Sequence, residues 1–400
     1  MDSSIALADA RPLVTTDVTI SVVIPCLNEA DTLGRCIHKA LQAMADHSIN
    51  GEVVVADNGS TDGSLEIAAN AGASIVHVAT KGYGNALMAG IGAARGRFVL
   101  MGDADDSYDF SELPKFLRPL EDGYDLVQGC RLPSGGGSIM PGAMPLLHRW
   151  WGNPMFSWLA RWWFRAPVHD IYCGMRAFRK SMYERLGLRC TGMEFATEMI
   201  IRASLQGARV AEVPTTLYQD GRIRRGPHLK TFQDGWRTLR LFLIYSPRWL
   251  FLAPGLFMIL AGVAGYGIAL PGARIDGVIF DAHTLLFSSL SILCGYQALS
   301  FGVLTKGYAV GANLLPPDRY TRRLLQGGTL EKGILAGLFA VIIGVALLAV
   351  AINQWRRADF GPLDYGHTMR WVIPGATLTA LGVQTVLSSF FLAVLGFTNQ

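Results

Sequence analysis

The hydrophobic residues of this chain follow two different patterns. Up to about residue 105, short apolar runs alternate with stretches in which apolar residues recur at helical spacing. From residue 247 onward, four long apolar runs follow one another with few charges between them. The pattern therefore predicts an α/β region followed by a helical membrane region.

The first region contains short β-rich runs that are separated by amphipathic stretches. The predicted strands cover residues 19–25, 52–56, 74–78 and 97–101. The predicted helices cover residues 30–45, 62–71 and 85–94. Regular alternation of this kind predicts a mostly parallel, doubly wound sheet, in which ligands bind beyond the carboxyl ends of the strands.

The four long apolar runs lie near residues 247–270, 283–304, 333–352 and 371–397. Each is long enough to cross a bilayer core, which needs roughly 20 helical residues. Only helices satisfy their own backbone groups in lipid, so these runs are expected to be helical. A large soluble core of buried helices is the alternative, and four such runs in succession argue against it.

Composition and charge add a division into three blocks. Half of the 400 residues are hydrophobic and only 16% are charged, compared with about 25% in an ordinary soluble domain. A purely soluble or disordered chain is therefore excluded. The net charge of +4 combines −9 for residues 1–148, +9 for residues 149–246 and +4 for residues 247–400.

The distribution of Lys and Arg predicts the orientation in the membrane. The loops between the predicted spans differ little, with five basic residues on one side and four on the other. The strongly basic segment before the first span is decisive, and it predicts that the preceding 246 residues and both termini are cytosolic.

Residues 1–18 are expected to be a flexible segment without a signal peptide. The six cysteines form no C-x-x-C pair, so reduced thiols are expected.

The most informative polar motif is Asp103-x-Asp105, which follows the predicted strand at residues 97–101. Two carboxylates at this spacing can reach one hard cation that also binds phosphate oxygens. Aspartate pairs are also common in turns, so the motif gains its meaning from its place after a buried strand. We interpret it as a site for a hard cation.

Polar residues also follow the first two strands. Asn28, Glu29 and Asp57 stand where a base edge or ribose hydroxyls could be bound, although Asn28 could equally cap the next helix. Lys81 and Gly82 open another predicted helix and are typical of a phosphate or base cradle, a weak signal by itself.

The basic block contains two amphipathic segments. The first, residues 147–166, has five tryptophans and three arginines within residues 148–166 and is predicted to lie in the membrane interface. A tryptophan-rich protein core is the alternative. The second segment, residues 231–246, is predicted to be a juxtamembrane helix. Between them, Arg222 and Lys230 belong to a cationic loop that could close over a diphosphate or be attracted to anionic lipid.

Taken together, the motifs VVIPCLNEAD, VVVADNGSTDGS, KGYGNAL and FVLMGDADDSYDF resemble glycosyltransferase family 2. The later motifs LVQGCR, DIYCGMRAF, GMEFATEM and YQDGRIRRGPHLK resemble its polyprenyl-phosphate glycosyltransferases, which include dolichyl-phosphate mannose and glucose synthases. The resemblance implies a GT-A domain over residues 19–230 and a transmembrane domain over residues 247–400.

The resemblance also implies roles for single residues. The nucleoside contacts would be Pro25, Asn28, Glu29 and Asp57. Asp103 and Asp105 would hold Mg²⁺ or Mn²⁺ on the donor diphosphate. The other donor-binding residues would be Lys81, Gly82, Arg222 and Lys230.

The acceptor and the sugar would be bound by residues of the basic block and its border. Arg131 would meet phosphate at the reaction centre, and Arg149 and Asn153 would grip the lipid phosphate. The sugar pocket would be lined or braced by Asp170, Arg176, Glu194 and Glu198. The chain departs from the family pattern at three positions, with Asn153 in place of Ser, Ser107 in place of a metal-binding Gln and Asn58 in place of a second Asp.

We therefore expect inverting transfer of a sugar from a UDP-glucose or GDP-mannose type of donor to polyprenyl phosphate. The acceptor phosphate, with a second pKa near ~6, needs no protein base. A processive polysaccharide synthase is an alternative, but its Q-x-x-R-W pattern is missing. An inactive membrane scaffold or a helper of lipid translocation is another. The expected partners are the donor, the lipid acceptor and the bilayer; nucleic acid is not expected and homo-oligomerisation is left open.

Overall fold

The computed structural model describes residues 18–222, 231–275, 277–317, 319 and 329–397. The chain divides into two compact units, residues 1–238 and residues 239–400, and each is described by itself. Lys230 and most of the predicted cationic loop lie outside the described residues.

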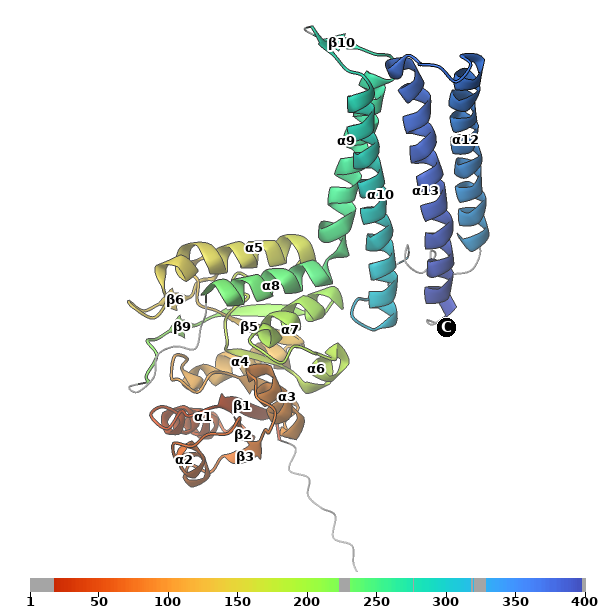
Figure 1. The fold of residues 1–400 in the computed structure, drawn as a ribbon. Coiled ribbons are helices and arrows are strands. Elements are labelled where there is room, and N and C mark those ends of the chain that lie inside the picture. Colours follow the sequence, from red (N-terminus) through yellow and green to blue (C-terminus); the bar gives the residue numbers. More distant parts are fainter. Residues whose placement is uncertain (1–17, 223–230, 276, 318, 320–328, 398–400) are drawn as a thin grey trace, which may run out of the picture. The chain divides into compact units, whose positions relative to one another are not determined.

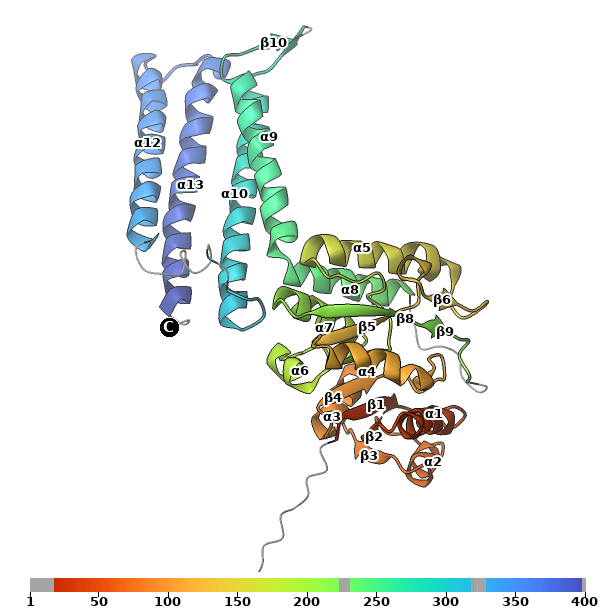
Figure 2. The same ribbon diagram turned by 180° about the vertical axis from the view of Figure 1, so that it is seen from behind.

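A seven-stranded sheet in the order β3-β2-β1-β4-β7-β5-β8 forms the centre of the first unit (Figures 1 and 2). Its strands are β1 Ile20–Cys26, β2 Gly51–Asp57, β3 Ser74–His77, β4 Phe98–Met101, β5 Leu126–Cys130, β7 Arg176–Arg179 and β8 Val210–Pro214. Only β7 runs antiparallel to its neighbours, so the predicted mostly parallel sheet is confirmed. A separate two-stranded piece pairs β6 (Ser138–Ile139) with β9 (Thr216–Leu217).

Helices connect the strands and cover both faces of the sheet. They are α1 Leu33–Asp46, α2 Ser64–Asn70, α3 Tyr83–Ala93, α4 Leu113–Glu121, α5 Asn153–Phe164, α6 Lys180–Leu186, α7 Glu194–Leu205 and α8 Thr231–Tyr245. Short helical turns occur at η1 Phe110–Glu112 and η2 Pro133–Gly135, and a π-helical turn occurs at η3 His148–Gly152. The predicted strands and helices of the first hundred residues match these elements to within three residues at either end.

The core follows from the alternation of side chains along the strands. In β1, Ile20, Val22 and Ile24 are fully buried in a cluster that includes side chains of α1 and α4. Val23 points to the opposite face and packs against α3. Its side chain lies so close to Gly90 that a Cβ atom added at residue 90 would collide with it. Both faces of the central strands are therefore buried, as expected for a parallel sheet between two helical layers.

The strand register brings the predicted polar clusters to one edge. Cys26, at the end of β1, is level with Asp57 at the end of β2, and Val23 is level with Met101 at the end of β4. The loops after these strands therefore leave the sheet side by side.

The tryptophan-rich segment forms η3 and α5, so the predicted helix begins with a π-helical turn. Along α5, Phe156, Ala160 and Phe164 are buried, whereas Trp158 and Trp162 are about half exposed. Trp150 and Trp151 in η3 are 67% and 73% exposed, which excludes the tryptophan-rich core. Figures 1 and 2 show the first half of α8 alongside α5.

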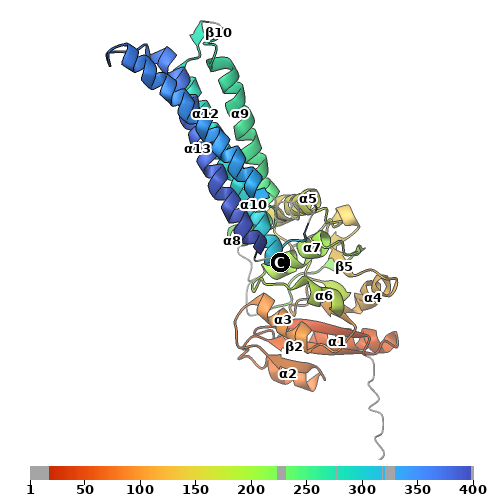
Figure 3. The same cartoon turned by 90° about the vertical axis from the view of Figure 1, so that its right-hand side faces the viewer.

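Among its described residues, the second unit contains four helices that are long and apolar enough to cross a membrane (Figure 3). They span Arg248–Ala269, Ala282–Gly311, Leu330–Arg357 and Tyr365–Gly396. The corresponding elements are η4 Arg248–Leu252, α9 Ala253–Ala269, α10 Ala282–Gly311, α12 Thr329–Arg357 and α13 Tyr365–Phe397. A small hairpin of β10 (Arg274–Ile275) and β11 (Val278–Ile279) precedes α10. The four predicted spans are confirmed as helices, with longer bounds in three of them.

Glycines bring the backbones of these helices into direct contact. Gly337 and Gly344 of α12 face Gly382 and Gly375 of α13, and an added Cβ at any of the four would collide with the partner's carbonyl oxygen or lie tightly against it. Gly255 of α9 and Gly295 of α10 meet in the same way. Close approach through small residues is typical of helix packing in lipid.

Candidate active site

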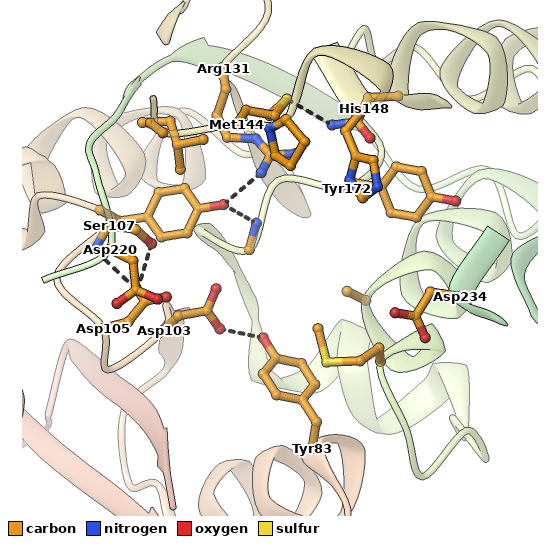
Figure 4. A pocket seen from close by; sticks show the side chains of 18 of the residues that line it. Tyr83, Asp103, Asp105, Ser107, Arg131, Met144, His148, Tyr172, Asp220 and Asp234 are labelled. Atoms are coloured by element: carbon orange, nitrogen blue, oxygen red, sulfur yellow. Dashed lines mark hydrogen bonds between the residues drawn. The ribbon is translucent and has the colours of Figure 1, made fainter. Parts of the chain in front are cut away.

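A cavity of about 610 Å³ opens at the carboxyl edge of the sheet in the first unit. Its walls come from the loops after β1 and β4, from η3, α5 and the start of α7, and from the segment after β9 and the beginning of α8. Figure 4 shows polar side chains converging on it from several of these elements. Residues far apart in the sequence are thus brought around one space.

The two aspartates of the D-x-D motif lie side by side at this cavity (Figure 4). Asp103 accepts a hydrogen bond of 2.8 Å from the Tyr83 hydroxyl. One oxygen of Asp105 accepts from both the backbone N–H and the hydroxyl of Ser107, at 3.1 and 2.6 Å. On the other side, the Asp103 carboxylate lies so close to Gly174 that a Cβ atom added at residue 174 would collide with it. Both carboxylates are therefore held in fixed orientations.

The electrostatics of this pair suit a divalent cation. Burial and, secondly, the neighbouring charge of Asp105 raise the pKa of Asp103 to about 6. A carboxylate whose charge is disfavoured in this way gains from a cation bound beside it. Within the described part of the chain, no three His, Cys, Asp or Glu side chains are grouped for metal binding. The residues present therefore fit an ion such as Mg²⁺ that takes one or two carboxylates and completes its shell with phosphate oxygens and water.

Arg131 is held in the cavity wall by Asp170. Its Nε and Nη2 donate to the two carboxylate oxygens at 2.7 and 3.0 Å, and its Nη1 donates to the Tyr108 hydroxyl at 3.2 Å. Asp170 is fully buried, whereas Arg131 lines the cavity. The carboxylate orients the guanidinium and leaves the arginine as the group that a ligand can meet.

A second arginine, Arg222, is paired with Glu29 on the other side of the Asp103 and Asp105 carboxylates. Its Nε and Nη2 donate to the two oxygens of Glu29 at 2.8 and 2.7 Å, and its Nη1 donates to Asp220 at 2.8 Å. The same nitrogen lies 3.7 Å from Asp105. Arg222 is thus beside the D-x-D motif, as a residue that binds donor phosphates would have to be.

Only some of the predicted nucleoside contacts line the cavity. Pro25 and Glu29 do, together with Asn58, whose side chain also accepts from the Gly82 N–H at 2.7 Å. Asp57 instead accepts from the N–H groups of the turn that follows it, at 3.0 Å each. To bind a nucleoside as predicted, the Asp57 carboxylate oxygens would have to accept hydrogen bonds from the ligand in addition to those from the turn.

Two further predicted donor residues stabilise the same loops. Asn28 has a positive φ of 61° and accepts hydrogen bonds from Thr61. Lys81 donates to the backbone carbonyl of Asn58. Neither Asn28 nor Lys81 is part of the cavity lining.

The side of the cavity near η3 and α5 is mainly apolar. Its apolar side chains are Met144, Leu147, Trp151, Met155 and Phe156. Asn153 lines this side, and its amide lies 3.5 Å from the Met144 sulfur. Arg149 does not line the cavity; its guanidinium lies 5.5 Å from the Trp150 ring centre. Of the two residues predicted to bind the lipid phosphate, Asn153 therefore lines the cavity and Arg149 does not.

Of the four predicted sugar-pocket residues, only Glu194 lines the cavity. Asp170 braces Arg131, as described above. Arg176 is fully buried and donates to backbone carbonyls, including that of Cys173 at 2.6 Å. Glu198 is buried and accepts from the N–H groups of Arg189 and Cys190 at 2.9 and 2.8 Å. These three residues lie behind the cavity wall. Such positions correspond to the bracing role, the second of the two roles expected for them.

Several cavity residues were missed in the sequence. Tyr83 and Tyr108 lie inside recognised motifs, so their neighbourhood was a usable signal. His148, Asp234 and Arg237 also line the cavity, and nothing in their sequence context distinguishes them. Burial and, secondly, the positive charge of Arg131 lower the pKa of His148, which favours its neutral imidazole.

The sequence is similar along nearly its whole length to that of a known glycosyltransferase. It is 36% identical over 383 residues to the low-salt glycan biosynthesis hexosyltransferase Agl6 of Haloferax volcanii, covering 94% of this chain and 89% of the relative. Residues 21–187 match glycosyl transferase family 2. The chain belongs to glycosyltransferase family 2. The expectation of an enzyme with a GT-A fold is thereby confirmed.

Further comparisons concern both parts of this family 2 glycosyltransferase. Residues 303–396 match the glycosyltransferase family 2 C-terminal transmembrane region, which confirms an integral membrane protein. The dolichyl-phosphate hexose transferase of Haloferax volcanii is 36% identical over 197 residues, covering 49% of this chain and 81% of the relative. A solved structure of glucosyl-3-phosphoglycerate synthase from Mycobacterium tuberculosis with Mn²⁺, UDP and phosphoglyceric acid has a TM-score of 0.46 and 22% identity, covering 56% of this chain and 77% of that chain.

Proposed function

We propose that this glycosyltransferase transfers a hexosyl residue from a nucleotide-sugar to polyprenyl phosphate, with a divalent metal ion and with inversion at the anomeric carbon. One observation carries the proposal. A single cavity is lined by the carboxylates of Asp103 and Asp105 and by an apolar wall that includes Met144, which lies near Arg131 (Figure 4). The donor and an amphiphilic acceptor therefore have complementary surfaces around one space.

The polar side of the cavity fits a nucleoside diphosphate. Asp103 and Asp105 would hold Mg²⁺ or Mn²⁺, which when bound neutralises the charge that develops on the leaving diphosphate. Arg222 lies beside Asp105 and adds a second positive charge. Pro25 and Asn58 line the neighbouring region, where the nucleoside would lie.

The apolar side fits an isoprenoid chain that carries a phosphate. Met144, Leu147 and Trp151 offer surface to a hydrocarbon chain, and no water-soluble acceptor would need them. Arg131 offers the charge that a phosphate needs. The name of one relative, the dolichyl-phosphate hexose transferase of Haloferax volcanii, agrees with an acceptor of this class.

The residues perform the transfer by positioning and charge neutralisation. Arg131, oriented by Asp170, would align an oxygen of the acceptor phosphate with the anomeric carbon. A bond from this oxygen to the anomeric carbon forms as the bond to the nucleoside diphosphate breaks, and the diphosphate leaves with its electron pair. The acceptor oxygen is already ionised, so no side chain has to take a proton.

The location of the reaction follows from the basic segment before the first span. We propose that the catalytic unit and both termini are cytosolic, because the cytosolic side of a membrane protein carries the excess of Lys and Arg. The exposed tryptophans of η3 and α5 would then lie in the interface, where the acceptor phosphate emerges from the bilayer.

A donor screen tests this proposal. Purified full-length protein is incubated with Mg²⁺ or Mn²⁺, polyprenyl phosphate and radiolabelled UDP-glucose, GDP-mannose or their analogues. We expect label in the lipid fraction with one donor, and none when the acceptor is a polyprenol without phosphate. Polymer would instead support a processive synthase, and absence of turnover with every donor would support an inactive scaffold.

A further inference from the structure

Glu29, which the sequence predicts to be a nucleoside ligand, forms a close ion pair with Arg222. Both carboxylate oxygens of Glu29 are occupied by the guanidinium, at 2.7 and 2.8 Å. The Glu29 side chain is 6% exposed and that of Arg222 is 12% exposed, so solvent screens the pair only weakly. Such a two-pronged contact fixes the direction of the guanidinium as well as its position.

The segment that carries Arg222 is attached to the D-x-D loop by its backbone. The Gly221 N–H donates to the Asp105 carbonyl at 2.9 Å, and the Tyr218 N–H donates to the Ser107 carbonyl at 3.0 Å. At Gly221, a side chain would be crowded by Thr32, Arg35 and the Asp105 carbonyl. Arg222 is therefore held at a fixed place next to the metal-binding carboxylates.

The remaining hydrogen-bonding capacity decides between two roles for Glu29. Among the described residues, three of the five guanidinium N–H groups of Arg222 are used by Glu29 and Asp220, and one N–H on each terminal nitrogen is left. These two groups can bind phosphate oxygens while the pair stays intact. A nucleoside bound by Glu29 would have to compete with the guanidinium for the same carboxylate oxygens, and breaking a buried ion pair is costly.

We infer that Glu29 is a positioning residue, which holds Arg222 against the donor diphosphate, and that it is not a nucleoside ligand. The inference rests on the proposed function, because it takes the donor to be a nucleoside diphosphate sugar. Asp220 supports the same arrangement through Nη1. The donor would thus be gripped by a metal ion on one side and by a carboxylate-oriented arginine on the other.

Binding without turnover separates the two roles. The affinities of UDP and uridine, or of GDP and guanosine, are measured by competition on the detergent-solubilised full chain with Mn²⁺. For Glu29→Gln we expect diphosphate affinity to fall roughly tenfold or more, as for loss of a charged hydrogen bond, and nucleoside affinity to change less than about twofold. Equal losses for both ligands would overturn the inference, because a nucleoside contact is common to both.

Arg222→Gln provides the second variant and closes a double-mutant cycle. The double variant Glu29→Gln/Arg222→Gln should bind the diphosphate no more weakly than Arg222→Gln alone, because Glu29 acts through the arginine. Additive losses would contradict this. If Glu29→Gln fails to fold, the same prediction is read from Arg222→Gln and Arg222→Lys, where nucleoside affinity should be retained and loss of it would overturn the inference.

A matched control is available at the opposite edge of the sheet. Glu52 also forms an ion pair with an arginine. Both Nε and Nη2 of Arg95 donate to one of its carboxylate oxygens, at 2.8 and 2.6 Å, and neither residue lines the cavity. Glu52→Gln should leave both affinities unchanged. If the wild type binds neither UDP nor GDP, the proposed function and this inference both fall; if it binds one of them and the nucleoside and diphosphate losses are equal, only the inference falls.

Discussion

Asp170 holds the guanidinium of Arg131 through two hydrogen bonds, from Nε at 2.7 Å and from Nη2 at 3.0 Å. The carboxylate is fully buried and also accepts from the Arg131 backbone N–H at 3.1 Å. The arginine lines the cavity and the aspartate does not. In the proposed function, Asp170 would therefore act on the acceptor phosphate through Arg131.

This relationship predicts a selective effect of Asp170→Asn. The amide cannot accept both guanidinium hydrogen bonds, so Arg131 loses its fixed orientation. We expect turnover to fall roughly 10²-fold, the scale for one preorganised electrostatic group, with UDP or GDP affinity unchanged. Steady-state kinetics with varied lipid phosphate and equilibrium nucleotide binding check this. An equal loss of nucleotide affinity would contradict a role confined to the acceptor.

Asp103→Asn should separate stability from activity. The variant keeps the shape of the side chain but removes the charge that Asp105 and burial disfavour. We expect transfer to fall by about 10²-fold or more, and the melting temperature of the metal-free protein at pH 8 to rise. Transfer assays and thermal unfolding in EDTA measure both. A lower melting temperature together with normal transfer would refute the assignment.

The same carboxyl predicts a pH dependence of stability. The pKa of Asp103 is raised to about 6 in the folded protein, from an ordinary value of 3.8 that applies to the unfolded chain. The folded state therefore binds the proton more tightly, and this group lowers the free energy of unfolding above pH 6. The penalty disappears as the pH falls from 6 towards 4. The difference in melting temperature between Asp103→Asn and wild type should be largest above pH 6 and small at pH 4; a constant difference would contradict it.

The membrane helices should be sensitive to size at their glycine contacts. In Gly382→Leu the new side chain would collide with the backbone carbonyl of Gly337, at a cost of about 1–3 kcal/mol. Gly267→Leu is the matched control, since an added Cβ at Gly267 meets nothing within 4 Å. We expect the first variant alone to lose its monodisperse elution in detergent after mild heating. Equal behaviour of the two variants would argue against packing of α12 on α13.

The exposed tryptophans predict contact with the bilayer interface. Trp158 and Trp162 are 52% and 51% exposed on the outer side of α5. In nanodiscs with brominated lipids, we expect the wild type to show more fluorescence quenching than the variant Trp158→Phe/Trp162→Phe, because bromine near the headgroups quenches tryptophans that lie there. Equal quenched fractions would place these side chains away from lipid.

The fold could be predicted from the sequence because its signals are local. Strands such as β1 and helices such as α10 are marked by hydrophobic pattern and length. The site was predictable only where a motif carries its own geometry, as in Asp103-x-Asp105. Which of the adjacent side chains Asp57 and Asn58 reaches the cavity depends on the turn after β2, which pattern does not determine.

Pairings across the chain could not be predicted in this way. Glu29 and Arg222 are 193 positions apart, and only the assembled sheet brings them together. The same is true of Asp170, which the sequence suggested for the sugar pocket and the structure places behind Arg131. Such partners are chosen by tertiary packing, which outweighs any local preference.

The most direct test of the proposed function is the identity of the lipid product. Purified full-length protein, metal ion, polyprenyl phosphate and the active nucleotide-sugar are incubated, and the lipid fraction is analysed by mass spectrometry. We predict polyprenyl phosphate heavier by one hexosyl residue, absent with Asp103→Ala and Asp105→Ala although both variants fold. Free sugar, polymer, or an unchanged yield of product from either variant would contradict the account.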